Sequence, residues 1–269
     1  MLYIIIILLR NVFLFKESEL PRSKLARLVH LPARKLYIGW CDMESKLWFE
    51  KSYRRSLMDM HIEDWDPSFL SLYQPSRHVS LLKEANVQSA MVYSHSHVGC
   101  CYWPTKTGHA HKSILESKRD ILGEFIESCR RENIDVIVYY SLIYNNRAYE
   151  QMPDARIIDI FGNASREESE EKTPSSRYGV CCPNSMEYRS LVKTQVNELL
   201  NSYRFEGIFF DMTFWPKICY CDHCRKRFFD ETGNELPKTV DWKDRDWVAF
   251  QRKREQWLAE FGHFATNIV

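Results

Sequence analysis

The stretch that reads Gly-Ile-Phe-Phe-Asp at residues 207–211 is a short apolar run that ends in a carboxylate. Short and nearly continuous apolar runs are typical of strands that are buried on both faces of a parallel sheet. Three earlier runs have the same character, at residues 57–62, 87–93 and 134–140. The sequence therefore predicts a series of parallel strands, of which the last carries an aspartate at its carboxyl end.

Amphipathic segments with helical spacing of their apolar residues lie between or after these runs, at 79–85, 113–132, 186–203 and 247–269. Strands and helices in alternation indicate right-handed βαβ units. A (β/α)8 barrel needs about 250 residues, so the length of 269 residues would hold a whole barrel, but too few strands are predicted. We therefore expect an α/β fold that is the N-terminal half, about four βα units, of a (β/α)8 TIM barrel whose C-terminal half is missing.

The beginning of the chain differs from the rest. The apolar run at residues 2–9 is too short to cross a bilayer, which takes about 20 helical residues, and it lacks the flanking features of a signal peptide. Residues 16–35 are basic and polar. We expect residues 1–45 to be a leader, poorly ordered or helical, and residues 46–269 to form the incomplete barrel domain. Residues 163–179 are predicted to be a long polar loop.

Composition limits the partners of this protein. Its 37 Lys and Arg against 36 Asp and Glu give a net charge of +1, so nothing in the overall charge favours nucleic acid or an anionic membrane surface. Its nine Cys, with adjacent pairs at 100–101 and 181–182, do not form the even framework of a small secreted domain. We therefore expect a reducing, cytoplasmic location.

Polar side chains lie at or near the ends of three predicted strands. Asp211 closes the fourth strand, where the active sites of βα barrels lie, although an aspartate there also serves to cap a loop. Asp59 and His61 are two residues apart on the first strand and so point to the same side. His95 and His97 follow the second strand. Neutral imidazoles hydrogen-bond sugar hydroxyls or bind a metal, so these residues predict a polar binding site.

A cysteine cluster follows Asp211. Cys219, Cys221 and Cys224 are close enough in the chain to bind one structural Zn²⁺, which prefers four tetrahedral ligands. The candidates for the fourth ligand are Cys182, Cys181 and His223, and we select Cys182. The alternative is a group of reduced and buried cysteines without a metal.

Several of these segments resemble one enzyme family. Residues 93–99 resemble the second-strand motif of the α-L-fucosidases of glycoside hydrolase family 29, through His97 and Gly99. Residues 120–141 are similar to the third helix and strand of that family. Residues 198–211 match the stretch that ends in its nucleophilic aspartate.

The resemblance is closer to the related family called hypothetical glycosyl hydrolase 6, which has a fucosidase-like barrel. The segments that look like its members are residues 102–108, 182–185 and 219–224. The resemblance extends over about residues 50–260 and therefore covers all of the predicted strands.

This resemblance implies a retaining glycoside hydrolase, α-L-fucosidase-like, that acts on an oligo- or polysaccharide with Asp211 as nucleophile. It implies no cofactor for catalysis, apart from the possible structural zinc. The predicted substrate-binding residues are Asp59, His61, Trp65, His95, His97, Trp103 and Tyr140. We expect the acid/base residue to lie outside this chain, and the chain to be a fragment that is inactive alone.

Two other functions fit the same residues. A metal-dependent barrel hydrolase would use Asp59, His61, His95 and His97 as ligands. A non-catalytic carbohydrate-binding module would keep the aromatic and polar face without performing the reaction.

Overall fold

The computed structural model describes residues 48–66, 68–164 and 178–269. Its sheet contains the strands β1 (Arg55–Leu57), β2 (Ser89–His95), β3 (Cys100–Cys101), β4 (His109–Ala110), β5 (Asp135–Ser141) and β6 (Gly207–Asp211). β1, β2, β5 and β6 are parallel and adjacent in that order, while β3 pairs antiparallel with the end of β2 and β4 pairs with β3. The predicted leader at residues 1–45 lies outside the described residues.

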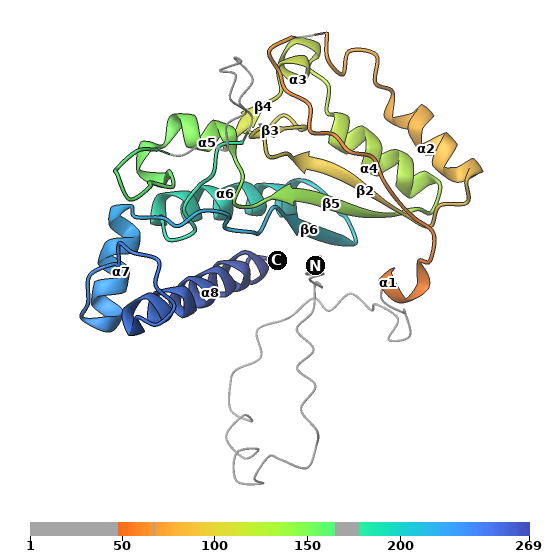
Figure 1. The fold of residues 1–269 in the computed structure, drawn as a ribbon. Helices are drawn as coiled ribbons and strands as arrows, with labels where there is room; N and C mark the ends of the chain where they lie inside the picture. Colours follow the sequence, from red (N-terminus) through yellow and green to blue (C-terminus); the bar gives the residue numbers. More distant parts are fainter. Residues whose placement is uncertain (1–47, 67, 165–177) are drawn as a thin grey trace, which may run out of the picture.

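Helices lie between the successive parallel strands and after the last of them (Figure 1). They are α1 (Trp48–Lys51), α2 (Pro75–Glu84), α3 (Lys112–Ser117), α4 (Ile121–Arg131), α5 (Asn146–Gln151), the 3-10 helix η2 (Pro153–Ala155), α6 (Met186–Ser202), α7 (Asp222–Thr232) and α8 (Arg245–Thr266). Among the described residues, no helix combines the length and the apolar character that crossing a membrane requires.

Helices α2, α4 and α6 pack on one face of the parallel strands. Val92 of β2, Val138 of β5 and Phe210 of β6 belong to the main core, together with Phe125 of α4 and Val196 of α6. The strands are therefore apolar on the face that the helices cover, as the continuous apolar runs in the sequence predict.

The opposite face of the sheet holds a second and smaller cluster. Tyr93 of β2 and Tyr139 of β5 are buried there with Met60, which follows β1. Tyr102 fixes this segment, because its hydroxyl accepts from the Ile62 N–H and its one hydrogen lies between the carbonyl oxygens of Met60 and Ile62, both within hydrogen-bond distance. This face carries the aromatic residues of the candidate site described below.

The predicted α/β fold with a parallel sheet is confirmed, and strands lie where they are expected near 87–93, 134–140 and 207–212. The first strand is the exception, because β1 ends at Leu57 instead of continuing through residue 62. After Leu57, the backbone groups of Met60 and Ile62 form hydrogen bonds with the Tyr102 hydroxyl and not with a neighbouring strand. The sheet is open, so a barrel is not observed in the described part of the chain.

The predicted helix over residues 113–132 is two helices, α3 and α4. Lys118 ends α3 in a left-handed conformation with φ of 55°, and Asp120 begins α4 by accepting a hydrogen bond from the Gly123 N–H at 2.8 Å. A left-handed residue cannot continue an α-helix, so the chain turns here despite the continuous apolar pattern. α5, α7 and the short strands β3 and β4 were not predicted.

Gly99 forms the turn between the end of β2 and β3, and it tests this part of the fold. Its φ is +86°, and a Cβ at this position would lie 2.6 Å from the backbone nitrogen of Arg147 and from Asn145 Oδ1. We predict that Gly99→Ala lowers the free energy of unfolding by about 2–5 kcal/mol, from backbone strain and from the overlap. Urea denaturation followed by circular dichroism measures this loss.

Gly162→Ala is the matched control for Gly99→Ala. Gly162 has the same φ of +86°, but no atom lies within 4 Å of the position that its Cβ would occupy. We therefore expect Gly162→Ala to lower the free energy of unfolding by only about 1–2 kcal/mol, from backbone strain alone. Equal losses in the two variants would contradict the steric role of Gly99.

Candidate active site

The candidate site lies where β2, β5 and β6 end, together with the segment that follows β1. Asp211 is the last residue of β6 and is half-buried. The Tyr139 hydroxyl donates a hydrogen bond to Asp211 Oδ2 at 2.8 Å, which fixes the orientation of the carboxylate. Met212 follows in the left-handed conformation, with φ of 52°. The aspartate is thus held by a neighbouring strand and is followed at once by a sharp change of chain direction.

Tyr93 connects Tyr139 to the segment that follows β1. Its ring stacks on the Tyr139 ring, with 3.8 Å between ring centroids and 10° between planes. Its hydroxyl lies 3.1 Å from His61 Nε2. His61 Nε2 also lies 3.6 Å from Asp59 Oδ1, and the Asp59 side chain is mostly exposed. Residues from three strands therefore form one continuous group.

His97 extends this group to the segment before α6. The His61 and His97 rings lie 4.0 Å apart, and the His97 ring stacks on the Tyr178 ring with 4.8 Å between centroids and 7° between planes. His97 itself is buried. The structure thus brings together Asp59, His61, His97 and Asp211 of the predicted site residues. It adds Tyr93, Tyr139 and Tyr178, which the sequence did not single out.

Tyr93 and Tyr139 carry neutral hydroxyl groups. Burial raises the pKa of the Tyr139 hydroxyl far above its usual value, and the negative charge of Asp211 raises it further. Burial also raises the pKa of Tyr93, as do the charges of Asp59 and Asp211. The two phenols therefore stay protonated across the physiological range, and that of Tyr139 donates to the carboxylate.

A bulge in β2 separates His95 from this group. The pairing of β2 with β5 shifts by one residue between Tyr93 and His95, so that Ser94 is the extra residue. His95 is fully buried and stacks on Tyr140, with 4.6 Å between ring centroids. Tyr140 belongs to the core on the helix side, where its hydroxyl donates to Gln195 Oε1 of α6 at 2.5 Å. His95 and Tyr140 therefore lie on the opposite face of the sheet from Tyr139, the hydrogen-bond partner of Asp211.

The two predicted tryptophans also lie apart from the group. Trp103 is 1% exposed within the main core. Trp65 is 62% exposed in the loop after β1, where its ring packs edge-on against Phe69 at 4.7 Å. The adjacent Asp64 is buried and accepts from Arg147 Nη2 at 2.5 Å. Asp64 therefore anchors the loop that carries Trp65.

The residues that could hold a metal ion are not those that the alternative function, a metal-dependent hydrolase, would use as ligands. Among the described residues, two groups of at least three potential ligand residues have all their ligand atoms within 4.8 Å of one another. One is Asp64, Cys100 and His109, and the other is the set Cys182, Cys219, Cys221 and Cys224. Neither includes the residues proposed for the metal-dependent hydrolase, because His95 packs on the helix side of the sheet.

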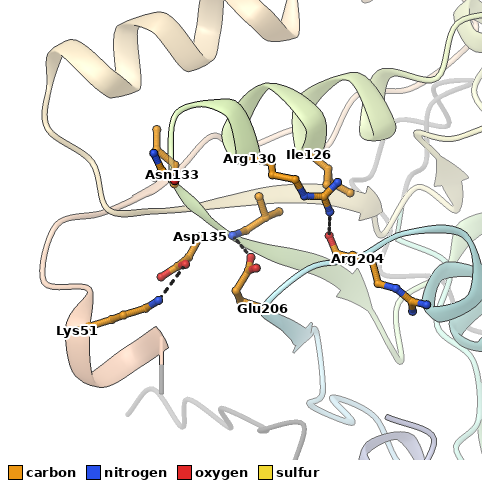
Figure 2. A pocket seen from close by; sticks show the side chains of 9 residues that line it. Lys51, Ile126, Arg130, Asn133, Asp135, Arg204 and Glu206 are labelled. Atoms are coloured by element: carbon orange, nitrogen blue, oxygen red, sulfur yellow. Dashed lines mark hydrogen bonds and ion pairs between the residues drawn. The ribbon is translucent and has the colours of Figure 1, made fainter. Parts of the chain in front are cut away.

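A hollow lies at the opposite end of the sheet from Asp211, near the starts of β5 and β6 (Figure 2). It has a volume of about 260 Å³ and is lined by Asp135, the first residue of β5, and by Glu206, which precedes β6. Both of its carboxylates have partners within the protein, since Lys51 Nζ lies 3.4 Å from Asp135 Oδ1 and Glu206 Oε2 accepts from the Val136 N–H at 2.7 Å. These carboxylates therefore link β5 to α1 and to the segment before β6.

The fold and the site define a parallel α/β protein with a half-buried carboxylate at the carboxyl end of its sheet, the position of active sites in such folds. The family model described as hypothetical glycosyl hydrolase 6 matches residues 75–212, and the chain belongs to this family. The match includes β2, β5 and β6 with Asp211. It ends before Cys219.

Solved structures with this fold include α-L-fucosidases. Alpha-L-fucosidase isoenzyme 2 from Paenibacillus thiaminolyticus matches with a TM-score of 0.65 and 22% identity, over 81% of this chain and 30% of that chain. The Thermotoga maritima alpha-fucosidase in complex with fucose matches with a TM-score of 0.40 and 24% identity, over 58% of this chain and 34% of that chain. The chain thus spans about a third of the length of these structures. A search of curated proteins gave no match.

His95 makes the stability of the fold dependent on pH. Complete burial lowers the pKa of its imidazole to about 3, although the nearby backbone of Ser141 opposes the shift. Between this value and the unfolded value of about 6.5, the unfolded chain binds a proton that the folded chain does not. The free energy of unfolding therefore falls as the pH falls, by up to about 1.4 kcal/mol per unit from this residue.

We predict that His95→Phe, which keeps a ring against Tyr140, removes this contribution. Between pH 7 and pH 5 the natural chain should lose about 2 kcal/mol of unfolding free energy that the variant keeps. Urea denaturation at pH 7, 6 and 5 measures both slopes. Identical slopes would show that His95 is not the residue responsible.

Proposed function

We propose that this protein is a glycoside hydrolase of the retaining type, similar to α-L-fucosidases, in which Asp211 attacks the anomeric carbon. Membership of the glycosyl hydrolase family supports hydrolysis of glycosidic bonds. The observation that carries the assignment is the Asp211 carboxylate at the end of β6, oriented by the Tyr139 hydroxyl at 2.8 Å. The parallel strands β1, β2, β5 and β6, adjacent in chain order, support a barrel-type architecture of the fucosidase kind.

The polar and aromatic neighbours fit the recognition of a sugar. His61 and His97 offer ring nitrogens and an aromatic face, and Tyr178 adds a flat ring next to His97. Sugar hydroxyls pair with imidazole nitrogens, and the apolar faces of sugar rings pack on aromatic rings. We assign substrate binding to these three residues, with Asp59 at the exposed side of the group.

The proposed reaction proceeds in two steps. The Asp211 carboxylate displaces the leaving group and forms a glycosyl ester, and water then hydrolyses this ester with retention of the anomeric configuration. The Tyr139 hydroxyl holds Asp211 Oδ2 and leaves the other oxygen for the attack. A second carboxyl group must protonate the leaving oxygen in the first step and activate water in the second.

The proposal predicts that Asp211→Gly abolishes the hydrolysis of activated aryl α-L-fucosides or of the activated aryl glycoside that the natural protein cleaves. Activated aryl groups leave without acid catalysis, so the test does not need the acid/base residue that we expect to lie outside this chain. The loss should be at least about 10³-fold in kcat, since removal of an attacking group costs more than removal of one supporting hydrogen bond. Added azide should restore turnover and yield a glycosyl azide, because it fills the space of the carboxylate and attacks in its place. Release of the aryl group and analysis of the product measure both effects.

Glu127→Gln, which changes an exposed carboxylate on α4, is the matched control and should keep full activity. A mechanism-based 2-fluoro sugar that stops turnover should label Asp211, as peptide mapping by mass spectrometry would show. Hydrolysis that survives Asp211→Gly, or a label on another residue, would contradict the assignment.

A carbohydrate-binding module without catalysis is the second candidate, and the row of His61, His97 and Tyr178 favours it. The same experiments separate the two functions. Saturable binding of a sugar, measured by calorimetry, without turnover and without a label on Asp211 would establish the binding module in place of the enzyme.

A further inference from the structure

Four cysteines from two separate segments meet beside the candidate site. Cys182 precedes α6, whereas Cys219, Cys221 and Cys224 lie between β6 and the first turn of α7. Their Sγ atoms all lie within 4.8 Å of one another, and all four residues are buried. The distance is 3.4 Å from Cys182 to Cys224 and 3.6 Å from Cys182 to Cys221. Four sulfurs are thus gathered around one point in the protein interior.

These distances fit a tetrahedral metal site. A zinc ion bound by thiolates at about 2.3 Å places neighbouring sulfurs about 3.8 Å apart. The structure records all four cysteines as free thiols. Four sulfur ligands in a closed and buried set are typical of structural zinc, and iron is the other metal that such a set accepts.

The surroundings compensate the charge that such a site would carry. Zinc with four thiolates has a net charge of −2. The guanidinium of Arg254 interacts electrostatically with Cys219 and Cys224, and that of Arg189 interacts with Cys182. Both arginines are half-buried. Two half-buried cations that interact with cysteines of this cluster favour an anionic centre over neutral thiols.

Backbone and amide groups also point to an anionic sulfur cluster. Cys221 is the N-cap of α7 and Cys224 lies in its first turn, where the helix dipole favours negative charge. The Asn184 amide donates to Cys224 Sγ at 3.3 Å. Asn184 Oδ1 in turn accepts from Arg227 Nη1 at 2.9 Å, which fixes the amide so that its nitrogen faces the sulfur. Such hydrogen bonds orient the ligands of metal sites.

We propose that Cys182, Cys219, Cys221 and Cys224 bind one structural Zn²⁺ that joins the segment before α6 to the segment after β6. The inference does not depend on the proposed function. The two segments carry parts of the candidate site, since Tyr178 lies four residues before Cys182 and Met212 begins the other segment. The zinc therefore fixes both segments at the rim of the sheet.

Metal analysis of the purified full chain tests the binding. We expect about one zinc per chain by mass spectrometry, and less than a tenth of this amount in Cys224→Ser. Cys181→Ser is the matched control, because Cys181 is buried next to Cys182 but its Sγ contacts the Asn145 carbonyl oxygen, at 3.7 Å, and it is not part of the cluster. The control should keep its zinc.

A spectroscopic measurement on the natural chain keeps the test decisive if Cys224→Ser does not fold. Replacement of the bound metal by Co²⁺ should give the intense visible absorption and the thiolate charge-transfer bands of a tetrahedral sulfur site. Four thiols, counted with a thiol reagent, should become reactive when the zinc is released. The proposal would be overturned if the natural chain were purified in a folded state without any metal, or with iron in place of zinc. A disulfide within the cluster, or equal zinc loss in Cys181→Ser, would also overturn it.

Hydrogen exchange tests the structural consequence. Removal of the zinc by a chelator should speed exchange in residues 178–185 and 212–224, while β2 and β5 keep their protection. If the zinc-free chain unfolds altogether, one equivalent of Zn²⁺ but not of Mg²⁺ should refold it, because zinc binds only the folded ligand set. Unchanged exchange in both segments after zinc removal would refute the proposed joining role.

Discussion

The register of three parallel strands is the constraint on which the candidate site depends. Tyr93 of β2 pairs with Tyr139 of β5, and Tyr139 pairs with Phe209 of β6. The register therefore stacks the two tyrosine rings and places the Tyr139 hydroxyl beside Asp211, two residues beyond Phe209. A shift of one residue in either pairing would turn one of these side chains to the helix side, because side chains alternate along a strand.

The bulge at Ser94 shows how one extra residue divides the histidines. Without it, alternation would place His95 and His97 on the same face as Tyr93. With it, His95 stacks on Tyr140 under the helices, where burial keeps its ring neutral. His97 instead reaches His61 and Tyr178. Because of this bulge, His95 lies in the core and His97 lies in the candidate site.

Two kinds of connection hold the rim of the sheet. Single hydrogen bonds and ring contacts join the ends of β2, β5 and β6. The cysteine cluster joins segments that are 37 residues apart, from Cys182 to Cys219. A metal at that cluster would add a direct link between two loops, which lack the regular hydrogen-bond ladder of the sheet.

The sequence by itself determined the α/β class, most of the parallel strands, the position of Asp211 at a strand end and the grouping of Cys219, Cys221 and Cys224, because apolar periodicity and short spacings are local properties of a chain. Only the tertiary structure decided between Tyr139 and Tyr140. Both lie in one apolar run without alternation, so the strand register alone selects the residue that faces Asp211. The bulge at Ser94 and the contact of Tyr178 with His97 likewise depend on pairings between distant segments, and a sequence pattern carries no information on such pairings.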